Sequence, residues 1–145
     1  MALTAMRDHN GLRVLVIEDN PDAAETLGDL LELFGHQAEI AHTGADGVDV
    51  ARRRPPDVVL CDIGLPEMDG YAVARELRGD PLTAPIRLVA ITGYGRESDR
   101  HRAAAAGFDL HLVKPVGPEA LKQLLEGFAE GGPGLAGPGD LQSQG

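Results

Sequence analysis

Five short apolar runs alternate with segments of helical pattern along most of this chain, and this alternation constrains the fold more than any other feature. Val14–Ile17 is apolar without a break, which is typical of a strand buried on both faces. Strands that alternate with helices favour right-handed crossovers and a parallel sheet with helices on both faces, an α/β fold. The expected strands are Val14–Ile17, Gln37–Ala41, Asp57–Cys61, Ile86–Ile91 and Leu110–Val113.

Capping residues mark the ends of the expected helices. Asn20 is a suitable N-cap and Pro21 a suitable first helical residue, while Gly35 lies where that helix should stop. Asp69 is expected to cap another helix. The remaining helices are expected at Ala45–Arg54, from Ser98 to Gly107, and around Leu121, Leu124, Leu125 and Phe128.

The length of 145 residues suits one folded domain, because two domains would each be near the size at which a core becomes marginal. From Gly131 onward the chain is rich in Gly and Pro and poor in apolar side chains. We therefore expect a flexible N-terminal segment over 1–11, one domain over 12–129, and a flexible tail over 130–145.

The charge balance argues against nucleic acid as a partner. Lys and Arg number 13 and Asp and Glu number 23, so the formal net charge is −10, which repels a phosphate backbone. The one basic run, 52–54, is interpreted as a solvated last helical turn, with a small docking patch as the alternative.

Cysteine usage and hydropathy point to a cytoplasmic protein. The single cysteine, Cys61, cannot form an internal disulfide and is expected to be a small buried hydrophobe rather than a redox centre. The first residues do not resemble a signal peptide, and no apolar run is long enough to span a membrane. We expect cytoplasmic localisation and no membrane partner.

Reactive side chains follow the expected strands. In an open parallel sheet, ligands bind outside the carboxyl ends of the strands, where the strand order reverses. Three carboxylates, one hydroxyl and one ammonium should converge there. The residues are Glu18 and Asp19 after the first strand, Asp62 after the third, Thr92 after the fourth, and Lys114-Pro115 after the fifth.

This set of groups favours phosphoryl chemistry beside a divalent cation. Three clustered carboxylates repel one another unless a hard cation joins them, and Mg²⁺ needs few protein ligands. Lys114 can pair with a carboxylate or a phosphoryl oxygen, and the Thr92 hydroxyl can donate to such an oxygen. Asp62 lies between the two sides and is the best candidate nucleophile toward phosphorus.

From Leu12 to Phe128 the chain resembles the receiver domain of bacterial two-component response regulators. The resemblance rests on Glu18-Asp19, on Asp62 followed by the stretch 65–70 (Leu-Pro-Glu-Met-Asp-Gly), on Thr92-Gly93 and on Lys114-Pro115. It implies a flavodoxin-like, doubly wound, five-stranded parallel sheet in the order 2-1-3-4-5 with five helices.

The resemblance also implies roles for the site residues. Asp62 would accept a phosphoryl group from a sensor histidine kinase or a histidine phosphotransfer protein. Asp19, Asp62 and the Gly64 carbonyl would bind Mg²⁺ directly, and Glu18 mostly through water. Thr92 would move toward the phosphoryl group and Lys114 would pair with it, after a cis peptide bond to Pro115. The fourth helix, fifth strand and fifth helix would then bind an unknown downstream protein differently.

Three positions modify this expectation. His111 occupies a position that is commonly Tyr or Phe in receivers, and we expect it to change rotamer as a switch residue and to add pH sensitivity. Gly64 offers no side chain to orient or block water, whereas Tyr94 is bulky enough to shield a phosphoryl group. The chain is thus expected to be a signalling switch with slow self-dephosphorylation, not an enzyme for an external metabolite.

Other functions fit the same residues less well. A phosphatase with a nucleophilic aspartate would need a second acid where Gly64 stands, and the acidic stretch 18–22 would repel a flavin phosphate. The histidines lack the spacing of a zinc site. An inert homologue stays open and would fail to bind Mg²⁺. The stretch 111–116 resembles receivers of hybrid kinases, so both a stand-alone protein and a hybrid-kinase module stay open.

Overall fold

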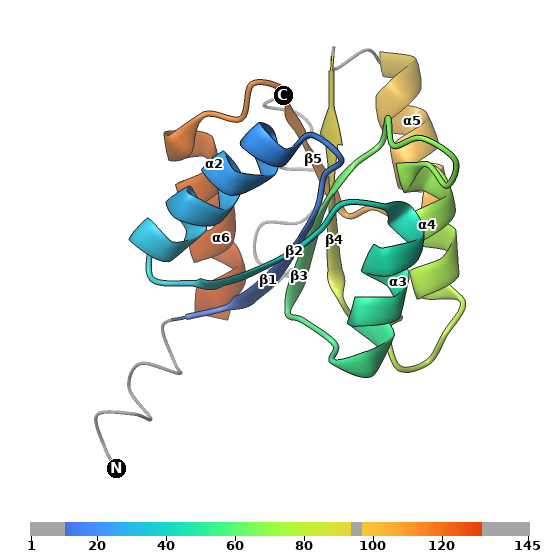
Figure 1. Cartoon of the computed structure of the whole chain (residues 1–145), viewed down its shortest axis with the longest axis horizontal. Helices are drawn as coiled ribbons and strands as arrows, with labels where there is room; N and C mark the ends of the chain where they lie inside the picture. The colour runs from blue at the N-terminus through green and yellow to red at the C-terminus, as the bar shows by residue number, and fades with distance from the viewer. Residues whose placement is uncertain (1–10, 94–96, 132–145) are drawn as a thin grey trace.

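The computed structural model of the chain describes residues 11–93 and 97–131 and contains a parallel sheet of five strands in the order β2-β1-β3-β4-β5 (Figure 1). The predicted fold and strand order are both confirmed. The strands are β1 (Arg13–Ile17), β2 (Gln37–Ala41), β3 (Val58–Asp62), β4 (Arg87–Thr92) and β5 (Leu110–Val113).

Five helices cover the sheet in two layers. Helices α2 and α6 lie on one face, and α3, α4 and α5 lie on the other (Figure 1). The order changes direction between β1 and β3, so the carboxyl ends of these two strands open onto the position where this type of sheet binds ligands. The helices are α2 (Pro21–Leu33), α3 (Gly44–Arg53), α4 (Gly70–Arg78), α5 (Glu97–Ala106) and α6 (Pro118–Gly131).

Side-chain caps fix where three of these helices begin. The Asn20 side chain accepts a hydrogen bond from the Ala23 amide at the start of α2, and Asp69 caps α4 in the same way, as predicted. The cap of α3 is Thr43, so this helix begins one residue earlier than expected. Helix α5 likewise begins at Glu97 rather than at Ser98.

The core has two aliphatic layers, one on each side of the sheet. Successive residues of β1 alternate between them: Leu15 and Ile17 join the layer under α3, α4 and α5, and Val14 and Val16 join the layer under α2 and α6. Cys61 is fully buried in the first layer, as predicted for a small hydrophobe, and this burial raises the pKa of its thiol far above the ordinary value.

The ends of the described region bear on the expected domain limits. Helix α6 continues to Gly131, two residues past the expected limit of the domain, while the expectations for 1–10 and 132–145 fall outside the described residues.

Arg52 pairs with Glu76 and Asp80 on the α4 side, so part of the basic run joins two helices. No helix among the described residues is both long and apolar enough to cross a bilayer.

Candidate functional site

Four strands deliver the predicted side chains to one edge of the sheet. Asp62 is the last residue of β3, and Glu18 follows the last residue of β1, with Ile17 paired beside Cys61. Thr92 ends β4, and the Lys114 amide donates a hydrogen bond to the Thr92 carbonyl at 2.8 Å. The parallel arrangement thus brings together the residues selected from the sequence.

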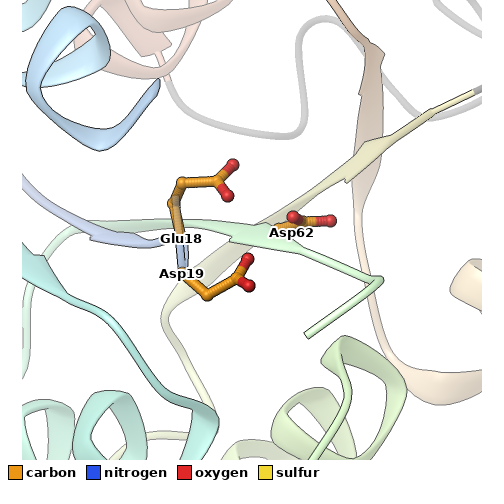
Figure 2. Close-up of side chains that lie close together, drawn as sticks. All are labelled: Glu18, Asp19 and Asp62. Atoms are coloured by element: carbon orange, nitrogen blue, oxygen red, sulfur yellow. The ribbon is translucent and has the colours of Figure 1, made fainter. Parts of the chain in front are cut away.

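Three carboxylates form an acidic cluster at this edge. Glu18, Asp19 and Asp62 each offer one oxygen within 4.8 Å of the others, and their side chains gather beside the ends of two strands (Figure 2). Glu18 and Asp62 are buried, with 1% and 7% of their surface exposed, whereas Asp19 is exposed. The cluster therefore opens to solvent on the Asp19 side.

Lys114 reaches into the acidic cluster from the β5 side. Its Nζ atom donates a hydrogen bond to Asp62 Oδ2 at 2.8 Å and lies 3.3 Å from Glu18 Oε1. Burial alone would lower the pKa of Lys114, but the hydrogen bond and charge of Asp62 outweigh burial and raise it. Lys114 therefore stays a cation. The peptide bond from Lys114 to Pro115 is cis, as expected.

Glu18 is held more firmly than the sequence indicated. Its Oε2 atom accepts a hydrogen bond from the Asn20 amide at 3.1 Å, while Oε1 has only the ion-pair contact with Lys114 and no hydrogen bond. Burial raises the pKa of the Glu18 carboxyl, and the amide of Asn20 and the charge of Lys114 only partly offset this effect. An incompletely satisfied buried carboxylate oxygen is a candidate acceptor for a metal-bound water or a cation.

Asp62 is oriented through both of its oxygens. Oδ1 accepts a hydrogen bond from the Gly64 amide at 2.8 Å, and Oδ2 accepts the bond from Lys114. The backbone carbonyl of Asp62 lies only 2.8 Å from where a Cβ on Gly70 would stand, so the loop between β3 and α4 packs tightly against the start of α4. Asp62 is thus fixed between a tight loop and the lysine.

The predicted switch residues lie on the opposite side of the site from Glu18. Thr92 is fully buried at the end of β4. His111 is half-buried in β5, and its pKa is lowered by burial and by the positive charge of Arg100. Tyr94 lies outside the described residues, so its expected shielding role stays a prediction.

The acidic cluster fits a divalent oxygen-seeking cation. The three carboxylates offer oxygens that all lie within 4.8 Å of one another, and carboxylate oxygens are ligands that Mg²⁺ prefers. The three carboxylates and the Lys114 ammonium leave a formal charge of −2, which one such ion would balance. The exposed Asp19 side leaves room for the waters that Mg²⁺ retains.

The sequence did not single out three residues that support the site. His42 Nδ1 lies 3.0 Å from the Glu18 carbonyl oxygen. Glu67, in the loop after Asp62, has a φ angle of 64°. Arg78 donates hydrogen bonds to carbonyls of the 80–86 and 107 segments and to Asp109, and so ties α4 to the start of β5. His42 and Arg78 belong to no recognisable motif, and only the position of His42 directly after a strand was a usable signal. Glu67 lies in the 65–70 stretch that carries the resemblance, but nothing in that stretch marked its backbone conformation.

Comparisons with known proteins agree with the site. A family model described as the response regulator receiver domain matches residues 14–126. The sensor histidine kinase RcsC of Escherichia coli is 32% identical over 126 residues, which are 87% of this chain but only 13% of RcsC. Protein PilH of Pseudomonas aeruginosa is 35% identical over 119 residues, which are 82% of this chain and 98% of PilH.

A solved structure adds a comparison in three dimensions. The receiver domain of a sensor histidine kinase from Pseudomonas aeruginosa PAO1, determined with a magnesium ion coordinated in its active-site cleft, aligns with a TM-score of 0.76 and 28% identity. The alignment covers 82% of this chain and 98% of that domain. With its sheet order, its acidic cluster and a family match over residues 14–126, the chain belongs to the response regulator receiver domain family.

Proposed function

We propose that this chain is a phosphoacceptor switch in which Asp62 receives a phosphoryl group. The observation that carries the proposal is the surroundings of the Asp62 carboxylate, which is held by the Gly64 amide and Lys114 beside Glu18 and Asp19. Receiver domains are signalling switches rather than enzymes of metabolism, and this arrangement provides an oriented nucleophile without a general acid for a substrate.

The transfer step uses the chain's own groups to position and neutralise the reactants. An oxygen of Asp62 attacks the phosphorus of a phosphohistidine on the donor, the P–N bond breaks, and an O–P bond forms. The donor imidazole leaves with the electron pair and takes up a proton from solvent. Lys114 then exchanges its contact with the carboxylate for one with a phosphoryl oxygen.

Mg²⁺ is the proposed cofactor of this step. Asp19, Asp62 and the Gly64 carbonyl would hold it directly and Glu18 through water, and the ion would offset the negative charge that collects during transfer. Support comes from the acidic cluster of this chain and from the magnesium ion in the active-site cleft of the related kinase receiver.

The proposed output is a change on the α5, β5 and α6 surface. A backbone hydrogen bond joins Lys114 to Thr92. A shift of either residue toward a phosphoryl group would therefore change the positions of the start of α5 and of β5. His111 lines a hollow between α5 and β5, where a rotamer change would alter the surface. The partner would be a cytoplasmic protein rather than nucleic acid, in keeping with the net charge of −10.

The proposal is tested by adding Mg²⁺ and beryllofluoride to the wild type and to Asp62→Asn and recording amide NMR spectra. We expect changes in the wild type around Asp62, Thr92 and β5 that Asp62→Asn lacks. Asp29→Asn, an exposed change in α2, is the matched control and should respond like the wild type. Identical responses of the wild type and Asp62→Asn would overturn the assignment of the acceptor.

A further inference from the structure

The peptide group that joins Glu18 to Asp19 is held from the neighbouring strand. In the preceding peptide group, the Glu18 amide donates a hydrogen bond to the Ala41 carbonyl at 3.0 Å, which extends the β1–β2 ladder by one residue. The Glu18 carbonyl oxygen lies 3.0 Å from Nδ1 of His42. A carbonyl oxygen can only accept, so His42 Nδ1 must carry the proton and donate.

This contact bears on Asp19 rather than on Glu18. The Glu18 carbonyl and the Asp19 amide belong to one planar peptide group, so a bond that fixes the carbonyl also fixes the plane from which the Asp19 Cα and side chain depart. Among the described residues, the Asp19 carboxylate has no hydrogen-bond or ion-pair partner of its own. Its place in the acidic cluster is therefore set by its backbone.

The other supports of this turn act on its two ends. The Glu18 carboxylate accepts a hydrogen bond from the Asn20 amide, and the Asn20 side chain caps α2 by accepting a hydrogen bond from the Ala23 amide. Neither bond restrains the 18–19 peptide plane, because the first bond involves the Glu18 side chain and the second involves the Asn20 side chain. The His42 ring is the one described side chain that bonds to this peptide group.

We propose that His42 is a positioning residue that orients Asp19 for binding a divalent cation. The proposal rests on the proposed function in that it takes the acidic cluster to be a cation site. His42 is exposed and contributes little to the core, so its contribution should be visible in cation affinity more than in folding. A partner that orients a ligand commonly affects metal affinity without touching the metal.

Two near-isosteric substitutions separate this hydrogen bond from other effects of the ring. The amide nitrogen of His42→Asn falls near the position of Nδ1 and can donate to the same carbonyl. The amide of His42→Gln falls nearer to Nε2 and cannot. His42→Ala removes the donor altogether, and Gln37→Ala, an exposed neutral change at the other end of β2, is the control.

The experiment is a titration of the full chain with MgCl₂ at constant ionic strength and pH 8, followed by amide NMR. We expect the Kd for Mg²⁺ to rise about three- to tenfold in His42→Gln and His42→Ala, the range for losing one neutral hydrogen bond. His42→Asn and Gln37→Ala should stay within about twofold of the wild type on the same grounds. Equal Kd values in all five proteins, or equal weakening in His42→Asn and His42→Gln, would overturn the proposal.

Failure of the wider proposal gives a different result. If the wild type shows no Mg²⁺ binding, or if Asp62→Asn binds Mg²⁺ as tightly as the wild type, the acidic cluster is not the cation site. A wild type that binds and an Asp62→Asn variant that does not, together with unaffected His42 variants, would remove only the role of His42.

Discussion

Glu67 shows the local strain in the loop that carries the acceptor aspartate into α4. Its φ angle of 64° lies in the left-handed region, which a non-glycine residue occupies at a cost of about 1–3 kcal/mol. The residues that flank Glu67 are closely packed, since a Cβ on Gly44 would come within 2.5 Å of the Met68 carbonyl and one on Gly70 within 2.5 Å of Ile63 Cα. The loop has little freedom to relax.

We predict that Glu67→Asn raises the free energy of unfolding by about 0.5–1 kcal/mol, because asparagine tolerates the left-handed region better than glutamate. Urea denaturation measures the difference. Glu67→Gln removes the same charge without this backbone preference and should leave stability nearly unchanged. Equal stabilisation by both substitutions would attribute the gain to charge instead of to backbone strain.

His36 makes the fold sensitive to mild acid. Its buried Nδ1 accepts a hydrogen bond from the Leu12 amide at 3.0 Å, and burial lowers the pKa of His36 although the charge of Glu126 opposes this. Protonation of His36 Nδ1 would turn this acceptor into an N–H donor that faces the Leu12 amide, which is also a donor. Because the pKa is lower in the folded than in the unfolded state, this contribution to stability is complete above about pH 6.5 and is lost as the pH falls from there through the folded pKa.

We therefore predict that the free energy of unfolding of the wild type declines as the pH falls below about 6.5. His36→Asn should decline less steeply, because an amide oxygen can accept the Leu12 bond and does not titrate. Urea denaturation at several pH values gives the two slopes. Parallel curves would show that His36 does not carry the pH dependence.

Helix α4 begins with a glycine for a steric reason. A Cβ on Gly70 would meet the Ile63 Cα at 2.5 Å and the Asp62 carbonyl at 2.8 Å, and both are backbone atoms that cannot swing aside. Gly127 in α6 is different, since nothing lies within 4 Å of the place its Cβ would occupy. The two helices thus contain one glycine that packing requires and one that packing does not require.

We predict that Gly70→Ala lowers the free energy of unfolding by about 1–3 kcal/mol, the usual range for overpacking, and also weakens Mg²⁺ binding because it displaces the acceptor loop. Gly127→Ala should instead raise stability by up to about 1 kcal/mol through helix propensity. Urea denaturation of both variants, with a Mg²⁺ titration of Gly70→Ala, provides the measurements. A Gly70→Ala protein with unchanged stability and affinity would contradict the close packing.

The strands and most helix starts could be predicted because their signals are local. An unbroken apolar run such as Val14–Ile17 and a cap such as Asp69 depend on neighbours in the chain. The site could be predicted because a parallel sheet converts the order of its strands into position, so Asp62 and Lys114, although distant in sequence, had to end at one edge.

The remaining features depend on contacts that the chain pattern does not encode. His42 reaches the Glu18 carbonyl only because β1 and β2 pair in one particular register, and Arg78 finds its acceptors in two separate segments, 84–86 and 107–109. The burial of Glu18 also could not be predicted from two adjacent acidic residues in the sequence. Such residues are defined by the assembled sheet rather than by any local motif.

Folding of the whole molecule brings mutually repelling carboxylates together at one edge of the sheet. Its net charge is −10, and the acidic cluster adds a local repulsion that Lys114 only partly offsets. The unfolded chain has no such cluster, because Glu18 and Asp62 are far apart in sequence. A divalent cation should therefore bind the folded state selectively and shift the folding equilibrium toward it.

We predict that Mg²⁺ raises the free energy of unfolding of the wild type, by about 2.7 kcal/mol when its free concentration is a hundred times the Kd. General screening of a chain with this net charge also stabilises it, so each urea titration with MgCl₂ is matched by one with NaCl at the same ionic strength. The excess over NaCl should be present in the wild type and in Asp29→Asn and absent in Asp62→Ala. If NaCl produced the whole effect, or if Asp62→Ala retained the excess, the folded state would have no specific cation site at the ends of β1 and β3.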